Sequence, residues 1–182
     1  MISMYPKNPM TQASARREAT AHQTSTRKTA ASTARGPRIP VRRSGIHGKG
    51  VFAVAPIAAG EVVVEYTGEI ISWPEALRRH PHDPSDPDHT FYFHIDDGRV
   101  IDGKFGGNAA KWINHGCAPN CEADECGDRV FVKALRDIAT GEELNYDYGL
   151  VLEGRHTAKV KKQFECRCGA AKCRGTMLAP KR

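Results

Sequence analysis

Apolar residues begin to follow a regular pattern only after about residue 40. Residues 1–40 are rich in Ala, Thr, Ser and Arg, and their apolar positions recur with a period of neither 2 nor 3.6. Such a segment cannot bury enough apolar surface to offset the conformational entropy that ordering would cost. We therefore predict a disordered basic tail over 1–40, with order beginning near residue 41.

Short strands are the main elements that the pattern predicts beyond this tail. The stretch "GEVVVEYTGEII", residues 60–71, is rich in β-branched residues and has glycines at its edges. Residues 91–95 and 99–101 flank Asp-Asp-Gly, which is a strong hairpin signal. Further short strands are expected at 129–134 and 143–146.

Helices are predicted to be few and short. Residues 72–75, Ser-Trp-Pro-Glu, form a capping box with proline in the first turn, so a helix should run through Arg79. The proline-rich residues 80–89 must then be loop. Asn108 can cap a second short helix over 109–113. The sum is a mainly β domain with short helices, and it lacks the βαβ rhythm of a Rossmann fold.

Composition places the chain among intracellular globular proteins. Its 182 residues, 40% hydrophobic, suffice for one domain with a tail. No stretch has the roughly 20 apolar residues of a membrane span, and the N-terminus lacks the apolar run of a secretory signal. We therefore expect no membrane contact and no secretion.

Charge is distributed unevenly behind the net value of +6. Nine Lys/Arg stand against one Glu in residues 1–43, and the same numbers recur in 155–182. The residues between hold nine basic and nineteen acidic side chains. An acidic body favours basic partners such as lysine-rich peptide tails, and the basic ends would bind nucleic acid only weakly. The alternative is that the acidic side chains merely form a solvated surface.

Six cysteines suggest a metal site, because cysteines stay reduced inside the cell. Cys166, Cys168 and Cys173 lie within "CRCGAAKC", so their thiolates can converge on one ion and leave one tetrahedral position unfilled. The fourth ligand must come from upstream, and the candidates are Cys117, Cys121 and Cys126. The alternative is a set of buried reduced thiols.

A thiol-protease dyad of His115 and Cys117 is disfavoured. Residues two positions apart rarely face each other, and such dyads are assembled from distant segments.

Five motifs occur in one order: "GIHGKGVFA", "EYTGE", "AKWINHGCAPN", "GEELNYDYG" and "CRCGAAKC". In this order they resemble the SET-domain protein lysine methyltransferases with a post-SET zinc module, over about residues 41–178. The resemblance implies a β-clip of small sheets with a C-terminal pseudoknot, in which the segment after Tyr148 passes the "INHGC" strand. It also implies a catalytic SET domain over 41–150 and a post-SET zinc-binding segment over 151–182.

The resemblance assigns two ligand sites. For S-adenosylmethionine it implies the residues His47, Gly48, Lys49, Gly50, Asn114, His115 and Arg167. For one structural Zn²⁺ it implies Cys117 as the fourth ligand beside Cys166, Cys168 and Cys173.

Three tyrosines match the family's lysine channel. Tyr148 corresponds to the invariant channel tyrosine and Tyr66 to another wall. Tyr146 corresponds to the position that determines how many methyl groups the lysine receives. A tyrosine there limits the room for added methyl groups, which predicts mainly monomethylation. Two positions depart from the family: Gly116 replaces a usual serine, which would loosen the turn without removing a ligand, and Phe91 replaces a tyrosine that commonly contacts the cofactor. Either Tyr92 assumes that role by a shifted register, or one hydrogen bond is lost and affinity falls modestly.

The resulting hypothesis is an S-adenosylmethionine-dependent protein-lysine N-methyltransferase acting on a basic protein, such as a histone or another DNA-packing protein. It would act in the nucleus of a eukaryote or the cytoplasm of a bacterium. The alternative is an inactive zinc-stabilised module that binds nucleic acid or protein through its basic ends. The segment "STRKTAAS" around Lys28 resembles histone tails and makes this lysine a candidate for self-methylation.

Overall fold

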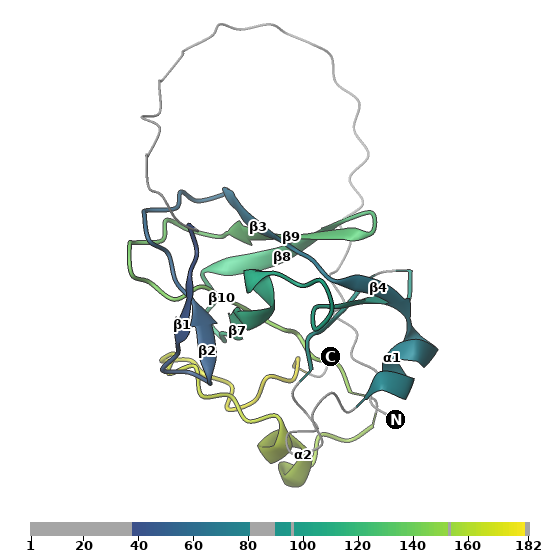
Figure 1. The fold of residues 1–182 in the computed structure, drawn as a ribbon. Coiled ribbons are helices and arrows are strands. Elements are labelled where there is room, and N and C mark those ends of the chain that lie inside the picture. The colour runs from purple at the N-terminus through teal and green to yellow at the C-terminus, as the bar shows by residue number, and fades with distance from the viewer. Residues whose placement is uncertain (1–37, 81–89, 96, 153, 181–182) are drawn as a thin grey trace, which may run out of the picture.

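Small antiparallel sheets dominate the computed structural model, which describes residues 38–80, 90–95, 97–152 and 154–180 (Figure 1). Lys28 and most of the predicted tail and of the proline-rich loop lie outside these residues. The tail was predicted to reach residue 40, but Ile39 is buried in the core, so order begins a few residues earlier. No helix within the described ranges is long and apolar enough to cross a membrane.

The strands pair into separate small sheets. β1 (Val41–Arg43) and β2 (Lys49–Val51) form an antiparallel hairpin. A second antiparallel sheet has the order β3 (Val62–Tyr66), β9 (Arg129–Ala134), β8 (Cys121–Cys126). A third has the order β4 (Glu69–Ser72), β6 (Arg99–Asp102), β5 (Tyr92–His94).

The remaining strand pair is parallel and joins distant parts of the chain. β7 (Asn114–His115) pairs with β10 (Asn145–Tyr146), so the segment leading into Tyr148 runs beside the "INHGC" strand. A parallel bridge between Leu150 and Leu178 then ties the end of the chain to the segment after Tyr148. This arrangement agrees with the expected SET-type fold.

The helices begin where the capping signals predict. Ser72 caps α1 (Trp73–Arg79) by accepting a hydrogen bond from the Glu75 amide. Asn108 caps η1 (Ala109–Trp112), which is a 3₁₀ helix and ends one residue earlier than predicted. α2 (Ala158–Gln163), capped by Thr157, was not predicted, and neither was β8.

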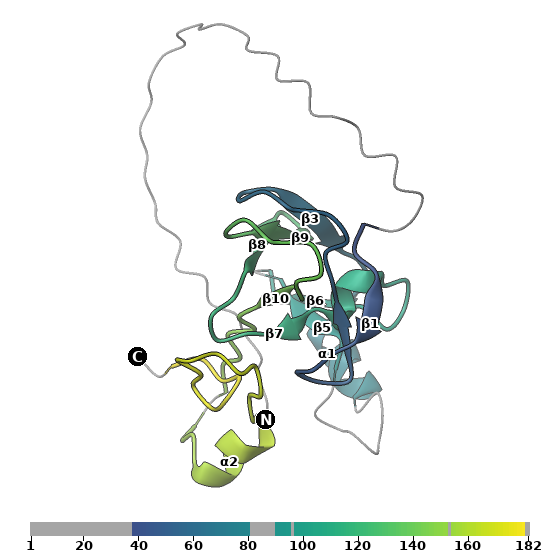
Figure 2. The same cartoon turned by 90° about the vertical axis from the view of Figure 1, so that its left-hand side faces the viewer.

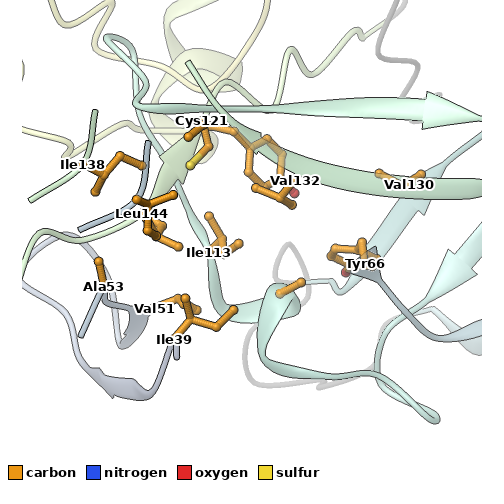
Figure 3. Close-up of a cluster of buried hydrophobic side chains, with 14 of the residues drawn as sticks. Ile39, Val51, Ala53, Tyr66, Ile113, Cys121, Val130, Val132, Ile138 and Leu144 are labelled. Atoms are coloured by element: carbon orange, nitrogen blue, oxygen red, sulfur yellow. The ribbon is translucent and has the colours of Figure 1, made fainter. Parts of the chain in front are cut away.

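The main core lies beneath the β3–β9–β8 sheet and includes residues of the expected site. Figure 3 shows Ile113, Leu144 and Val132 pointing toward one another. Tyr66 and Tyr146 belong to the same buried cluster. The C-terminal segment from α2 onward lies on the side of the molecule away from this sheet in both views (Figures 1 and 2). Tyr66 and Tyr146, which are packed in this core, are thereby placed between the rest of the domain, called the body below, and the C-terminal segment.

Candidate active site

A cavity of about 670 Å³ lies where the body of the protein meets its C-terminal segment. Its walls come from residues 46–49, from β5 and η1, and from residues 162–167. The structure brings most of the predicted site residues to this cavity: His47, Gly48, Lys49, Tyr66, Asn114, His115, Tyr146, Tyr148, Cys166 and Arg167. Gly50 is not among the lining residues.

Aromatic rings form one wall of the cavity. The ring centroids of Tyr146 and Tyr148 are 5.1 Å apart, and those of Tyr66 and Phe93 are 5.5 Å apart. Phe93 also lies 6.4 Å from the ring of Tyr146, which links the two pairs. The three predicted tyrosines therefore form one continuous aromatic surface, although they come from β3, from β10 and from the residues after β10.

Two hydroxyl groups on this wall are held by backbone carbonyls. Tyr66 Oη donates to Phe91 O at 2.8 Å, and Tyr148 Oη donates to Ile113 O at 2.8 Å. Burial raises the pKa of both phenols, and it raises that of Tyr146 in the same way. All three hydroxyls stay protonated at neutral pH, and those of Tyr66 and Tyr148 can act as fixed hydrogen-bonding groups rather than as bases.

A polar cluster of Ser44, Asn114 and Glu143 holds the 46–49 turn. The Asn114 side-chain amide lies 2.8 Å from Lys49 O and 2.9 Å from Glu143 Oε1. Asn114 therefore contacts the backbone of this turn as well as the cavity. Of this cluster the sequence analysis identified only Asn114.

His115 connects the aromatic wall to the cysteines. Its Nδ1 accepts a hydrogen bond from the Tyr148 amide at 3.1 Å, so its Nε2 carries the proton and donates to Cys117 Sγ at 3.3 Å. Burial lowers the pKa of this imidazole to about 4, which keeps it neutral. The expectation that His115 and Cys117 do not face each other is therefore wrong. Both ring nitrogens are engaged, so His115 would contact a ligand through its backbone.

The predicted metal ligands lie together. The sulfur atoms of Cys117, Cys166, Cys168 and Cys173 are all within 4.8 Å of one another. Cys117 Sγ is 3.6 Å from Cys166 Sγ and 3.9 Å from Cys173 Sγ. A tetrahedral Zn²⁺ with bonds of about 2.3 Å requires sulfur separations of about 3.8 Å, so this thiol set fits one zinc ion.

Neither competing cysteine belongs to this cluster. Cys121 is fully buried in β8 among the core side chains (Figure 3), and burial raises the pKa of its thiol to about 11. Cys126 is exposed at the end of the same strand. Cys117 is therefore the upstream member of the cluster.

An ion pair fastens the C-terminal segment beside the cysteines. The Arg174 guanidinium donates to both carboxylate oxygens of Asp147, at 2.6 and 2.8 Å, and the Arg174 amide donates to Cys117 Sγ. Asp147 precedes Tyr148, so the pair links the cysteine cluster to the aromatic wall. No local sequence signal marks a contact between residues 27 positions apart.

The ring of Tyr92 lines the cavity, but its hydroxyl is engaged by α1. Its hydroxyl donates to Ala76 O at 3.0 Å and so is directed at α1. Phe91 packs edge-on against Trp112, with centroids 4.8 Å apart. The hairpin therefore contributes ring surface to the cavity through Phe93 and Tyr92.

A family model described as "SET domain" matches residues 48–149. Similar proteins include "Histone-lysine N-methyltransferase trithorax" of Drosophila virilis, 39% identical over 140 residues, or 75% of this chain and 4% of that protein. "Histone-lysine N-methyltransferase, H3 lysine-4 specific" of Kluyveromyces lactis is 38% identical over 148 residues, or 79% of this chain and 14% of that protein. This chain thus corresponds to a small part of these relatives.

A similar fold occurs in a solved structure described as "ctPRC2 in an autoinhibited conformation bound to S-adenosylmethionine". The TM-score is 0.56 and the sequence identity 31%, over 62% of this chain and 15% of that one. Family model, relatives and fold agree with the family that the motif order indicates. The chain belongs to the SET-domain family.

Proposed function

We propose that this chain is an S-adenosylmethionine-dependent protein-lysine N-methyltransferase that acts on a basic, histone-like protein. The observation that carries the proposal is the convergence of Tyr66, Tyr146 and Tyr148 on a cavity closed by the 46–49 turn and the C-terminal segment. The names of the relatives, which are histone-lysine N-methyltransferases, support the same class of substrate.

The cavity suits a cofactor of this size, because sites for such molecules have volumes of roughly 300–1,000 Å³. S-adenosylmethionine, when bound, supplies a methyl group on a positively charged sulfur. We assign its binding to the cavity-lining residues His47, Gly48, Lys49, Asn114, His115 and Arg167. Gly50 does not line the cavity and would affect binding of the cofactor only through the conformation of the turn.

The aromatic wall would prepare the substrate lysine. An ammonium group has an ordinary pKa of about 10.4 and must lose its proton before its nitrogen can attack a methyl carbon. Rings that exclude water disfavour the charged amine and lower this pKa. The hydroxyls of Tyr66 and Tyr148, fixed by carbonyl acceptors, would orient the neutral amine in line with the carbon–sulfur bond that breaks.

Four thiolates would hold a structural zinc ion behind this wall. Cys166 also lines the cavity, and Arg167, which follows it, lies on the cavity rim. Binding of the ion would therefore fix the segment that closes the cavity. Zinc has no part in the transfer itself in this proposal.

Methyl transfer can be measured directly. Radiolabelled S-adenosylmethionine and core histones should give labelled histone with the wild type. Tyr148→Phe, which loses the hydroxyl bonded to Ile113 O, should lower the rate by about 10²-fold while zinc content is unchanged. Wild-type labelling no higher than that of the variant would refute the enzyme and favour the inactive, nucleic-acid-binding module.

The packing around Tyr146 bears on how many methyl groups the lysine can receive. This side chain is buried between Phe93 and Tyr148, so we propose that added methyl groups find little room and that the main product is monomethyl-lysine. Mass spectrometry of the same reaction separates the products, and mostly trimethylated lysine would contradict this assignment. The same spectra would decide whether Lys28 is modified.

A further inference from the structure

The turn over residues 46–49 has little apolar packing to hold its shape. His47, Gly48 and Lys49 are all exposed, and Gly48 adopts the left-handed backbone conformation at φ 42°. Segments with few buried contacts open easily unless polar contacts fix them. A binding surface built from this backbone therefore needs another source of rigidity.

Ser44 organises the start of the turn. Its hydroxyl oxygen accepts hydrogen bonds from the amides of Ile46 at 2.9 Å and His47 at 3.3 Å. Its own amide donates to Gly48 O at 3.0 Å. The hydroxyl proton is then available for one acceptor, and the acceptor determines how the hydroxyl is oriented.

That acceptor is a carboxylate 99 positions later in the chain. Ser44 Oγ donates to Glu143 Oε1 at 2.7 Å, and the Asn114 amide, which also contacts Lys49 O, lies 2.9 Å from the same oxygen. A single charged oxygen thus joins both ends of the turn. Hydrogen bonds to a carboxylate are roughly twice as strong as those between neutral groups.

The backbone of Glu143 is itself fixed. It forms an antiparallel bridge with Phe52, and its carbonyl accepts a hydrogen bond from Asn120 Nδ2 at 2.9 Å. A Cβ at Gly50 would overlap Glu143 Oε1. Gly50 is buried with an ordinary strand conformation, so it is glycine because the carboxylate occupies the space beside it, not because the turn requires it.

We propose that Glu143 is a positioning residue for the methyl donor: its carboxylate, acting through Ser44 and Asn114, fixes the 46–49 turn in the shape that lines the cavity. The inference rests on the proposed function for the identity of the ligand. Glu143 does not line the cavity, so it acts on the ligand only through the turn and the Asn114 side chain.

The test compares Glu143→Ala and Glu143→Gln with Glu142→Gln. Glu142 is the neighbouring carboxylate, but it bonds Arg136 and Asn120 rather than the turn. Calorimetry measures the Kd for S-adenosylmethionine. Hydrogen exchange of the backbone amides, measured without ligand, shows how firmly the turn is held. Melting temperature and zinc content show whether each variant folds.

Glu143→Ala should raise the Kd for S-adenosylmethionine by about tenfold or more and speed exchange at the Ile46 and His47 amides. The KM for histone substrate should not change. Glu143→Gln keeps a carbonyl acceptor without the charge, so its Kd should lie between those of wild type and Glu143→Ala. Glu142→Gln should leave Kd and exchange at wild-type values.

Ser44→Ala supplies an independent check. Because Ser44 and Glu143 act on the same turn, the double variant Ser44→Ala/Glu143→Ala should raise the Kd hardly more than either single variant. If the effects of the two single variants on the Kd add in the double variant, Ser44 and Glu143 do not act on the same turn.

An unchanged Kd in Glu143→Ala overturns the inference, as does an equal loss of affinity for donor and histone. If Glu143→Ala does not fold, the Gln variant decides by the same criteria. A wild type that binds the donor but transfers no methyl group refutes the proposed function alone. A wild type that binds no donor refutes both.

Discussion

Gly116 shows at the scale of single residues how closely β7 and β10 approach each other. Its amide donates to Tyr146 O at 3.1 Å, and a Cβ at this position would overlap the side-chain oxygen of Asn145. Glycine in place of the serine that is usual in the family was expected to remove no ligand. The structure adds that this chain has no space for that serine unless Asn145 moves.

Gly116→Ser should therefore lower the free energy of unfolding by about 1–3 kcal/mol, the usual cost of overpacking. Urea unfolding measures the change. Gly45→Ser is the matched control, because a Cβ at Gly45 would have no atom within 4 Å apart from those of its chain neighbours. In an Asn145→Ala background the cost of Gly116→Ser should shrink, and an undiminished cost would show that the two side chains do not compete for space.

At the scale of elements, one guanidinium bridges α1 and two strands of the sheet below it. Arg79 donates to Glu75 in α1, to Glu69 in β4 and to Asp102 in β6. Hydrogen bonds to these carboxylates raise the pKa of Arg79. Asp102 is fully buried, so the guanidinium is a cation beside a carboxylate that has no access to water.

Arg79→Met should lower the melting temperature clearly more than a change at an exposed arginine, because it removes the cation from buried Asp102. Arg78→Met is the matched control: Arg78 also bonds Glu75, but its side chain is 75% exposed, and surface pairs contribute about 0–1 kcal/mol. Thermal unfolding of both variants measures the difference. Equal losses of stability in the two variants would mean that the contact of Arg79 with Asp102 stabilises the protein no more than a surface ion pair does.

Elements with strong local signals could be predicted from the sequence. The capping residues Ser72 and Asn108 and the Asp-Asp-Gly turn each fix a boundary within a few residues. β8 lacks such a signal: its sequence "CEADEC" is acidic and without β-branched residues, and pairing with β9 makes it a strand. α2 buries none of its residues, so it has no apolar face for periodicity to detect.

At the scale of the whole molecule, the site combines motifs with contacts that no motif contains. The sequence predicted the cavity-lining tyrosines and the cysteine cluster, because each lies within a recognisable short string. It did not predict the contact of Ser44 with Glu143 or the ion pair of Asp147 with Arg174. Those contacts depend on chain crossings that form only in the folded protein.

The C-terminal segment lines the cavity and also carries three of the clustered cysteines, so a metal ion bound there would couple to closure of the cavity. Cys173→Ser should lose most of the zinc, which we expect at one equivalent in the wild type. Its affinity for S-adenosylmethionine should fall with the zinc, because residues 162–167 would no longer be held against the body. Metal analysis and calorimetry on one preparation measure both losses.

Cys126→Ser is the matched control, because this thiol is exposed on β8 and is not part of the cluster. It should keep both zinc and donor affinity. Chelation of the wild type should reproduce the Cys173→Ser phenotype, and returning zinc should restore binding in the wild type but not in the variant. Donor affinity that survives complete zinc removal would show that the body alone, through the 46–49 turn and β7, forms the binding site. The C-terminal segment would then contribute stability without shaping the cavity.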